Sequence, residues 1–262
     1  MAERIDEVGR YYIAVKRCDT VAGILFWICA ALALSVPYAD EVLPLEYLGY
    51  VNGLFIIFVL FQVGTSTFSS VHLLPRAEGK RRHQLLSDSF GVPLSFDRTQ
   101  GYYNNYLSPS VARLGANVLE NTLFTKEICA EMIKRTRCRN GIYFVLWVAM
   151  VIDRHTDLNF ILAATQVLFS GEIIVKWAHL EVLQNRTERI HDDLCTHYRN
   201  RIDNTGNMGV AEIVDAFTAY EAAKAAASVS LSKPIFNKLN PELSVKWDQI
   251  RQNLRLDEVE AE

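Results

Sequence analysis

Two long apolar runs dominate the first part of the chain, at residues 21–36 and 47–71. Neither run contains Asp, Glu, Lys, Arg or His, and the segment 37–46 between them carries two prolines and three acidic residues. A helix needs about 20 apolar residues to cross the hydrocarbon core of a bilayer. The segment 53–61 is also apolar on every side of a helix, which leaves no polar stripe for water. The pattern therefore predicts a transmembrane hairpin. The alternative is a buried helical hairpin in a soluble domain.

A second and weaker pair of apolar runs follows at residues 141–152 and 158–171, on either side of the polar turn 153–157. Each uncharged stretch has only about 13 residues, which is short of a full crossing. Tyr143 and Trp177 lie near the ends of this pair, as interfacial aromatic residues often do. Hydropathy alone therefore leaves two and four spans open.

The distribution of charge favours one topology. Lysine and arginine are concentrated before the first run, between the two pairs and after the fourth run, whereas the turns 37–46 and 153–157 are mainly acidic. Because cytoplasmic loops carry an excess of Lys and Arg, we expect an even number of spans with both termini in the cytoplasm. We favour four spans, near residues 20–38, 47–71, 140–153 and 158–177.

The expected fold class is an all-α membrane protein. It has two transmembrane helical hairpins and a cytoplasmic helical module built from the central loop and the C-terminal tail. The expected parts are an amphipathic N-terminal helix at 1–19, a first hairpin at 20–71, a cytoplasmic loop and helix at 72–139, a second hairpin at 140–177 and a cytoplasmic helical tail at 178–262.

Turn-forming and aromatic residues mark an ordered loop within 84–117. A helix is expected at 110–139, with an interruption at 120–125. In the tail we expect a break at 204–207, a helix at 208–230 and a short final helix at 243–256.

Four residues of the central loop combine rigid amphipathic rings with adaptable amides, as binding surfaces do. These candidates for sensing a trigger are Tyr102, Tyr103, Asn104 and Asn105. The alternative is a structural loop whose tyrosines pack on the helices. The preceding segment 73–82 is a juxtamembrane basic cluster, which anchors to anionic headgroups or, less often, forms a ligand site.

Small and polar residues within the apolar runs give the candidate sites in the membrane. Gly49 and Gly53 form a GxxxG pair, a spacing that allows close contact between helix backbones. Other polar residues recur at helical spacing in the inner half of the second run, with a shorter counterpart in the fourth. Such stripes either join helices or line water. The candidate pore-lining or helix-packing residues are Gln62, Ser66, Ser69, Gln166, Ser170 and Glu172.

The cluster at 191–197 is the one group of residues that resembles a metal or hydrolase site. His191, Asp192, Asp193, Cys195 and His197 lie among arginines, however, which is more typical of a salt-bridged helix face. Phosphate-binding loops and a nucleophile elbow are absent from the sequence. We therefore expect no catalytic residue, no metal and no cofactor, and a protein that is not an enzyme.

Composition adds two further expectations. The formal net charge of −3 gives no case for binding nucleic acid, because a dedicated binder usually carries a basic excess. The five cysteines are scattered without a CxxC pair, which indicates free thiols in a reducing compartment.

The order of these parts resembles the prokaryotic four-transmembrane effectors encoded beside SMODS-type nucleotidyltransferases. In that family the second span leads through a helix to a Phe-Asp…Leu-Pro element, and a basic helix enters the third span. Here no Asp follows the phenylalanine, and Leu94 stands in place of a Trp, while segment 134–139 matches the basic helix. The resemblance covers about residues 1–200 in organisation. The nearest matches to the first element are Ala77, Lys80, Gln84, Phe90 and Pro93.

The resemblance implies an antiviral effector of the bacterial inner membrane that acts in abortive infection. It would stay silent until a cyclic nucleotide or a sensor protein triggers it, then form a homo-oligomer and permeabilise the bilayer. Four helices from one chain pack without a wide lumen, so any pore must be shared between copies. The main alternative is a membrane-anchored adaptor that presents a cytoplasmic helical binding module. A third hypothesis is a membrane-tethered hydrolase that uses His191 and Asp192.

Overall fold

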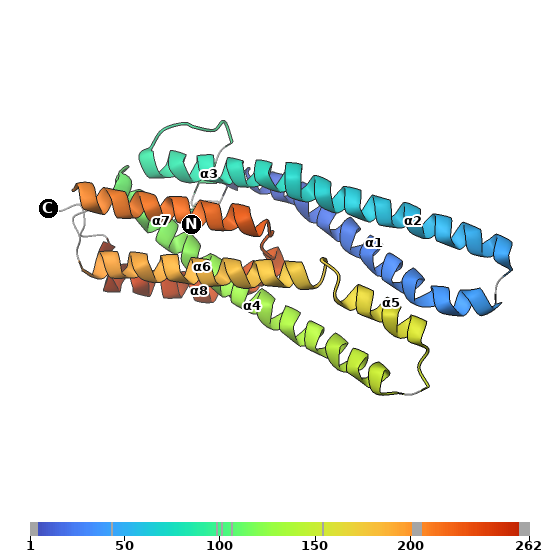
Figure 1. Ribbon diagram of the computed structural model, residues 1–262. Helices are drawn as coiled ribbons and strands as arrows, with labels where there is room; N and C mark the ends of the chain where they lie inside the picture. The colour runs from blue at the N-terminus through green and yellow to red at the C-terminus, as the bar shows by residue number, and fades with distance from the viewer. Residues whose placement is uncertain are drawn as a thin grey trace. The chain divides into compact units, whose positions relative to one another are not determined.

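The computed structural model describes residues 5–42, 44–97, 99–100, 102–105, 107–153, 155–200 and 206–256. This part of the chain is all-helical apart from two strands of two residues, β1 (Ile5–Asp6) and β2 (Thr99–Gln100), which pair antiparallel with Ile5 opposite Gln100. The all-α prediction is confirmed. The helices in Figure 1 are α1 (Gly9–Val42), α2 (Leu45–Phe68), the π-helical turn η1 (Ser69–Leu73), α3 (Leu74–Phe90), α4 (Val111–Ile152), α5 (Leu158–Leu168), α6 (Ile174–Arg199), α7 (Asn207–Ala227) and α8 (Lys233–Asn253).

The chain divides into two compact units. We call the first the bundle unit; it contains Met1–Tyr12, Pro75–Ile133 and His179–Glu262. The second is the hairpin unit, which contains Ile13–Leu74 and Lys134–Ala178. Helices α1, α3, α4 and α6 each contribute residues to both units.

In the hairpin unit, α1 and α2 form an antiparallel helical hairpin (Figure 1). Two helices are long and apolar enough to cross a membrane, Gly9–Ser35 and the continuous helix Tyr47–Phe90, and only 17% and 6% of their most apolar windows are buried. The core helix of a soluble domain would be mostly buried. Leu60 and Phe61, for example, expose about two thirds of their surface (66% and 65%).

The second helix of this hairpin continues into α3 through the π-helical turn η1, which ends two residues before Pro75. A proline in a helix lacks the N–H that would bond to the carbonyl four residues earlier, and its ring clashes with that carbonyl. The wider π turn accommodates this defect, so the helix continues where a break is otherwise expected.

The second hairpin of the hairpin unit consists of the end of α4 and the short helix α5. The Asp157 carboxylate caps α5 by accepting hydrogen bonds from the Asn159 and Phe160 N–H groups, and Trp147 Nε1 on α4 donates to Thr165 Oγ1 at 2.8 Å. With 11 residues, α5 is about 16 Å long, roughly half of a hydrocarbon core. The span predicted near 158–177 is not one continuous helix, because α5 ends at Leu168 and α6 starts only at Ile174.

Several element boundaries differ from the predicted ones. The helix predicted at 1–19 begins only at Gly9, and α3 continues beyond Gln84 to Phe90, where Gly91 ends it with a φ of +64°. Helix α4 has no interruption at 120–125. The final helix α8 starts at Lys233 rather than 243 and carries Pro241 in its interior.

The bundle unit has a core of large apolar side chains from α4, α6, α7 and α8, among them Leu119, Leu194, Ile213 and Trp247. Gly115 on α4 allows the closest approach in this core. A Cβ atom at Gly115 would lie 2.2 Å from the Tyr198 hydroxyl oxygen and 3.2 Å from Ile213. The buried Tyr198 hydroxyl donates to the Ala112 carbonyl at 3.1 Å, so the ring cannot move away without losing that bond.

We therefore expect Gly115→Ala to destabilise the bundle unit. Overpacking costs about 1–3 kcal/mol, which exceeds the gain of about 1 kcal/mol from replacing glycine in a helix. Denaturant unfolding of the full chain in detergent, followed by tryptophan fluorescence, measures the change. The matched control is Gly79→Ala on α3, where an added Cβ meets nothing within 4 Å and the stability should stay equal or rise. Equal shifts for the two variants would contradict the close contact.

Candidate functional site

A cluster of half-buried charged and polar residues joins the start of α1, α3 and α7 in the bundle unit. We call Tyr12, Glu78, Glu221 and Lys224 the ionic cluster. Lys224 Nζ lies 2.7 Å from Glu78 Oε2 and 2.8 Å from Glu221 Oε1, and the Tyr12 hydroxyl donates to Glu78 Oε1 at 2.8 Å. The Lys224 side chain is only 13% exposed, and its ammonium also lies 4.9 Å from the centre of the Tyr220 ring. Small alanines around Lys224 on α7 leave room for these partners.

The electrostatics of the ionic cluster keep Lys224 charged. Burial by itself lowers the pKa of the Lys224 ammonium, but the carboxylates of Glu78 and Glu221 outweigh it and hold that pKa well above its ordinary value. Burial and the charge of Glu78 raise the pKa of the Tyr12 phenol, which therefore stays a neutral hydrogen-bond donor. Removing the Lys224 ammonium should be costly, because it leaves the Glu78 and Glu221 carboxylates without their shared cation.

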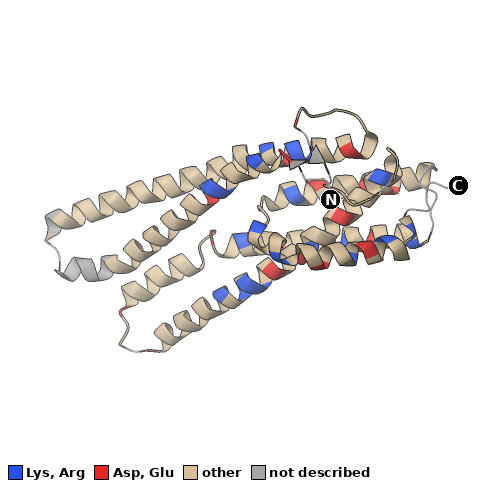
Figure 2. Ribbon diagram, turned by 180° about the vertical axis from the view of Figure 1, so that it is seen from behind, with Lys and Arg blue, Asp and Glu red and all other residues tan. Residues whose placement is uncertain are grey.

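Arg81 forms a second layer beside the ionic cluster. Its guanidinium donates to Asp6 Oδ2 at 2.9 Å and lies over the rings of Tyr12 and Tyr102, with its carbon 5.8 Å and 4.3 Å from the ring centres. This layer fixes the segment before α1 and the central loop to α3. Figure 2 shows the charged residues on the helices of the bundle unit, whereas α2 from Tyr47 onward and α5 carry none.

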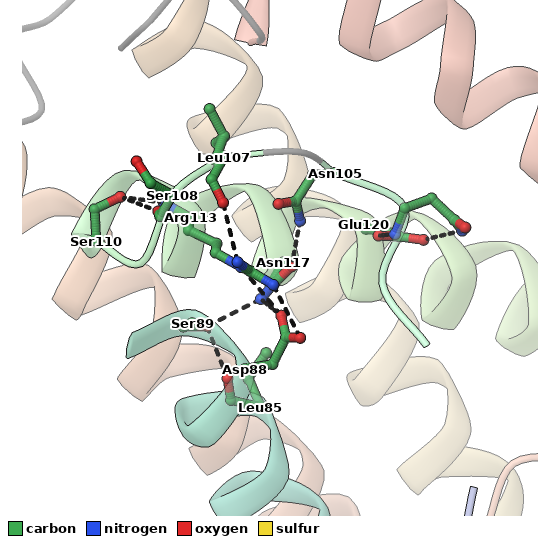
Figure 3. Close-up of polar contacts among 11 residues, drawn as sticks. Leu85, Asp88, Ser89, Asn105, Leu107, Ser108, Ser110, Arg113, Asn117 and Glu120 are labelled. Carbon is green, nitrogen blue, oxygen red and sulfur yellow. Dashed lines mark hydrogen bonds and ion pairs between the residues drawn. The ribbon is translucent and has the colours of Figure 1, made fainter. Parts of the chain in front are cut away.

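A polar network joins α4 to the central loop and to Asp88 at the end of α3 (Figure 3). Arg113, Asn117 and Glu120 lie at positions i, i+4 and i+7 of α4, which places them on one helix face. Arg113 Nη2 donates to Asp88 Oδ1 at 3.0 Å, and Asn117 Nδ2 donates to Asp88 Oδ2 at 3.0 Å. Asn117 Oδ1 accepts from Asn105 Nδ2 at 2.5 Å.

These bonds show how the four predicted trigger-binding residues lie. The backbone N–H and the side-chain amide of Asn104 donate to the Glu120 carboxylate at 3.1 and 2.8 Å, and its carbonyl accepts from Trp247 Nε1 at 3.1 Å. Asn105 is buried, Tyr103 packs against the bundle core, and Tyr102 contacts the Tyr103 ring and Arg81. The geometry favours the alternative interpretation of a structural loop whose tyrosines pack on the helices.

The polar residues predicted to line a pore or to join helices do not share one environment. Ser69 is buried, and its hydroxyl donates to Asp19 Oδ1 on α1 at 2.6 Å, which is a bond that joins two helices. Gln62 and Ser66 are half-buried on the same side of α2. Gln166 is exposed on α5. Ser170 and Glu172 lie in the break before α6, where Glu172 pairs with Lys176.

Gly49 and Gly53 lie on the exposed side of α2, and a Cβ atom at either position would meet nothing within 4 Å. Neither glycine is therefore a point of close helix contact within the chain. A contact between copies remains a prediction.

The residues around His191 do not converge on a site. His191 is buried, with its Nδ1 3.2 Å from Thr122 Oγ1, and burial lowers its pKa to about 4. Asp192 and Asp193 are exposed, and His197 Nδ1 contacts Glu212 at 2.6 Å. Within the described ranges, no three His, Cys, Asp or Glu side chains are grouped so that they could hold a metal ion.

Comparison with protein-family models, curated proteins and solved structures found no match. The functional argument therefore depends on the geometry of this chain. The ionic cluster was not predicted from the sequence. Its one local signal is the pair Glu221 and Lys224, spaced i and i+3 within an alanine-rich helix whose small residues indicate close packing.

We expect Lys224→Met to lower the free energy of unfolding of the bundle unit by about 3–5 kcal/mol, because Glu78 and Glu221 lose their shared cation. The control is Lys246→Met, which removes an exposed ion pair with Glu127 and should cost less than about 1 kcal/mol. Denaturant unfolding in detergent compares both variants. Adding Glu78→Gln to Lys224→Met should recover part of the loss. Equal costs for the two lysine variants would show that the ionic cluster contributes no more than a surface pair.

Proposed function

We propose that this chain is a multi-pass protein of the bacterial inner membrane that permeabilises the bilayer as a homo-oligomer. The observation that carries the proposal is the apolar exterior of α1 and α2, whose most apolar windows are only 17% and 6% buried. Water does not support a long hairpin with apolar side chains on its outer surface, whereas lipid does. The bundle unit and both termini are proposed to lie in the cytoplasm, and the lysines and arginines between and after the apolar runs support this orientation by the positive-inside rule.

Permeabilisation requires more than one copy. Within the chain, the Ser69 hydroxyl is used to join α2 to α1, which leaves Gln62, Thr65 and Ser66 as half-buried polar residues of α2. Gly49 and Gly53 lie on the exposed side of α2, where the backbone of another copy could approach closely. Gln62 and Ser66 lie on the side of α2 that faces α1, so an interior that conducts water would also require α2 to turn relative to α1, which lets copies bring these residues together.

The ionic cluster supplies a means of control. Lys224 on α7 binds Glu78 on α3, and Glu78 binds Tyr12 on α1. Helix α1 and the continuous helix that ends in α3 are the two apolar helices, so a trigger that shifts α7 acts on both. A cyclic nucleotide or a sensor protein is the proposed trigger.

A membrane-anchored adaptor is the second candidate. It is favoured by the buried polar network around Asn117, which holds the central loop in one conformation, as a preformed binding module requires. The hydrolase hypothesis has less support, because His191 faces Thr122 in the core while Asp192 is exposed.

Reporter fusions test the topology. Fusions at residues 42, 100, 155 and 262 should report periplasm, cytoplasm, periplasm and cytoplasm, because Lys and Arg are concentrated on one side. A cytoplasmic signal at 155 would reduce the number of spans to two. This fusion is the most informative one, because α5 has only 11 residues.

Permeabilisation is tested by expressing the chain in cells that carry a membrane-potential dye. The wild type should depolarise the cells once triggered or overexpressed. Gln62→Leu with Ser66→Ala should accumulate normally and lose the depolarisation, because an apolar constriction excludes water.

Ser69→Ala is the control for this experiment. It removes the bond to Asp19 and should lower the abundance of the protein rather than its conductance per molecule. A wild-type chain that inserts but never depolarises cells would favour the adaptor.

A further inference from the structure

We propose that Arg10, Tyr11, Arg76 and Lys80 form a binding site for the phosphate of an anionic phospholipid headgroup. This inference rests on the proposed membrane location and adds the lipid class that the protein recognises. We call these four residues the headgroup site. All four belong to the bundle unit.

Three cations converge on one aromatic ring at the headgroup site. The guanidinium carbons of Arg10 and Arg76 lie 5.2 and 5.7 Å from the centre of the Tyr11 ring, and Lys80 Nζ lies 5.6 Å from it. Arg76 and Lys80 are spaced i and i+4, so they lie on the same face of α3. Arg10 and Arg76 are exposed, which leaves their guanidinium groups accessible to a ligand.

The buried carboxylate of Asp97 faces this group of cations. Its Oδ1 accepts from Arg10 Nη2 at 2.5 Å and its Oδ2 lies 3.1 Å from Lys80 Nζ, while the Tyr11 hydroxyl is 3.4 Å from Oδ2. The Asp97 side chain is 4% exposed. The three cations carry more charge than the Asp97 carboxylate, which pairs with Arg10 and Lys80. A phosphodiester carries one negative charge, and arginine binds phosphate oxygens in a bidentate manner.

The position of the headgroup site along the chain favours a lipid over a soluble anion. Tyr11 lies two residues before Ile13, where α1 enters the hairpin unit, and Arg76 lies two residues after Leu74, where the chain leaves it. In a membrane protein these are the points at which the two apolar helices meet the headgroups. Juxtamembrane lysines and arginines attract anionic lipids, and tyrosine is enriched at this depth.

Asp97 acts in this arrangement as an internal anion that occupies part of the site. It holds Arg10 and Lys80 beside Tyr11, and a headgroup phosphate competes with it for the same cations. Replacing Asp97 by a neutral residue should therefore strengthen lipid binding. If the ion pairs of Asp97 were purely structural, the replacement would not strengthen lipid binding.

The test uses the full-length chain in an uncharged detergent, with thermal unfolding measured against added short-chain phosphatidylglycerol. Phosphatidylglycerol should raise the melting temperature, and equal concentrations of short-chain phosphatidylcholine or inorganic phosphate should not. Arg76→Gln with Lys80→Gln should weaken the phosphatidylglycerol affinity about 25-fold, at about fivefold for each cation. The matched control is Arg82→Gln, an exposed arginine of the same helix, which should change the affinity less than about twofold.

Asp97→Asn gives the deciding result. It should lower the melting temperature without lipid and tighten phosphatidylglycerol binding several-fold. Unchanged or weaker binding, an equal effect of phosphatidylcholine, or an equal loss in Arg82→Gln would overturn the headgroup site. A matching effect of inorganic phosphate would overturn its assignment to a lipid. Alkaline extraction of membranes separates the two proposals: release of the chain overturns both, whereas retention without phosphatidylglycerol selectivity overturns the headgroup site alone.

Discussion

The apolar surface of α2 is the constraint on which the other features of the hairpin unit depend. Its exposed side chains, such as Leu60 and Phe61, need a medium other than water, and its half-buried side faces α1. In lipid the hydrophobic effect does not hold two helices together, so polar bonds and close packing must do so. The Ser69 to Asp19 hydrogen bond supplies one such link. It lies in the π-helical turn that also accommodates Pro75, so one short segment joins the helices and lets the chain continue into α3.

The bundle unit is held together by a buried apolar core rather than by polar bonds between lipid-facing helices. Apolar side chains such as Trp247 and Leu194 form its core, and charged groups are buried only where each has partners. Lys224 is the clearest case, because two carboxylates compensate its burial. Buried ion pairs contribute little net stability, yet they strongly disfavour alternative arrangements of the helices that carry them. The ionic cluster therefore specifies how α1, α3 and α7 meet more than it stabilises them.

The sequence predicted the helical class because apolar periodicity depends on residues close together in the chain. It did not predict the ionic cluster, whose partners Tyr12, Glu78 and Lys224 lie 66 and 146 residues apart. The polar residues at 120–125 were interpreted as an interruption of α4. They are instead paired within the bundle: Thr125 with Tyr220 at 2.9 Å and Glu120 with Asn104. A single sequence does not distinguish polar residues that form a turn from polar residues that bond to a partner far away in the chain.

The use of polar groups within one chain limits where a water path can form. Ser69 is committed to Asp19, Glu172 to Lys176, and the amides of the central loop to α4. Gln62 and Ser66 on α2 are half-buried, and two residues on one helix cannot line a path alone. A conducting interior therefore needs the same two residues from several copies, and it needs a face of α2 on which copies can meet. The exposed side of α2 that carries Gly49 and Gly53 provides such a face, but Gln62 and Ser66 lie on the other side, toward α1, so conductance also requires α2 to turn relative to α1 after assembly.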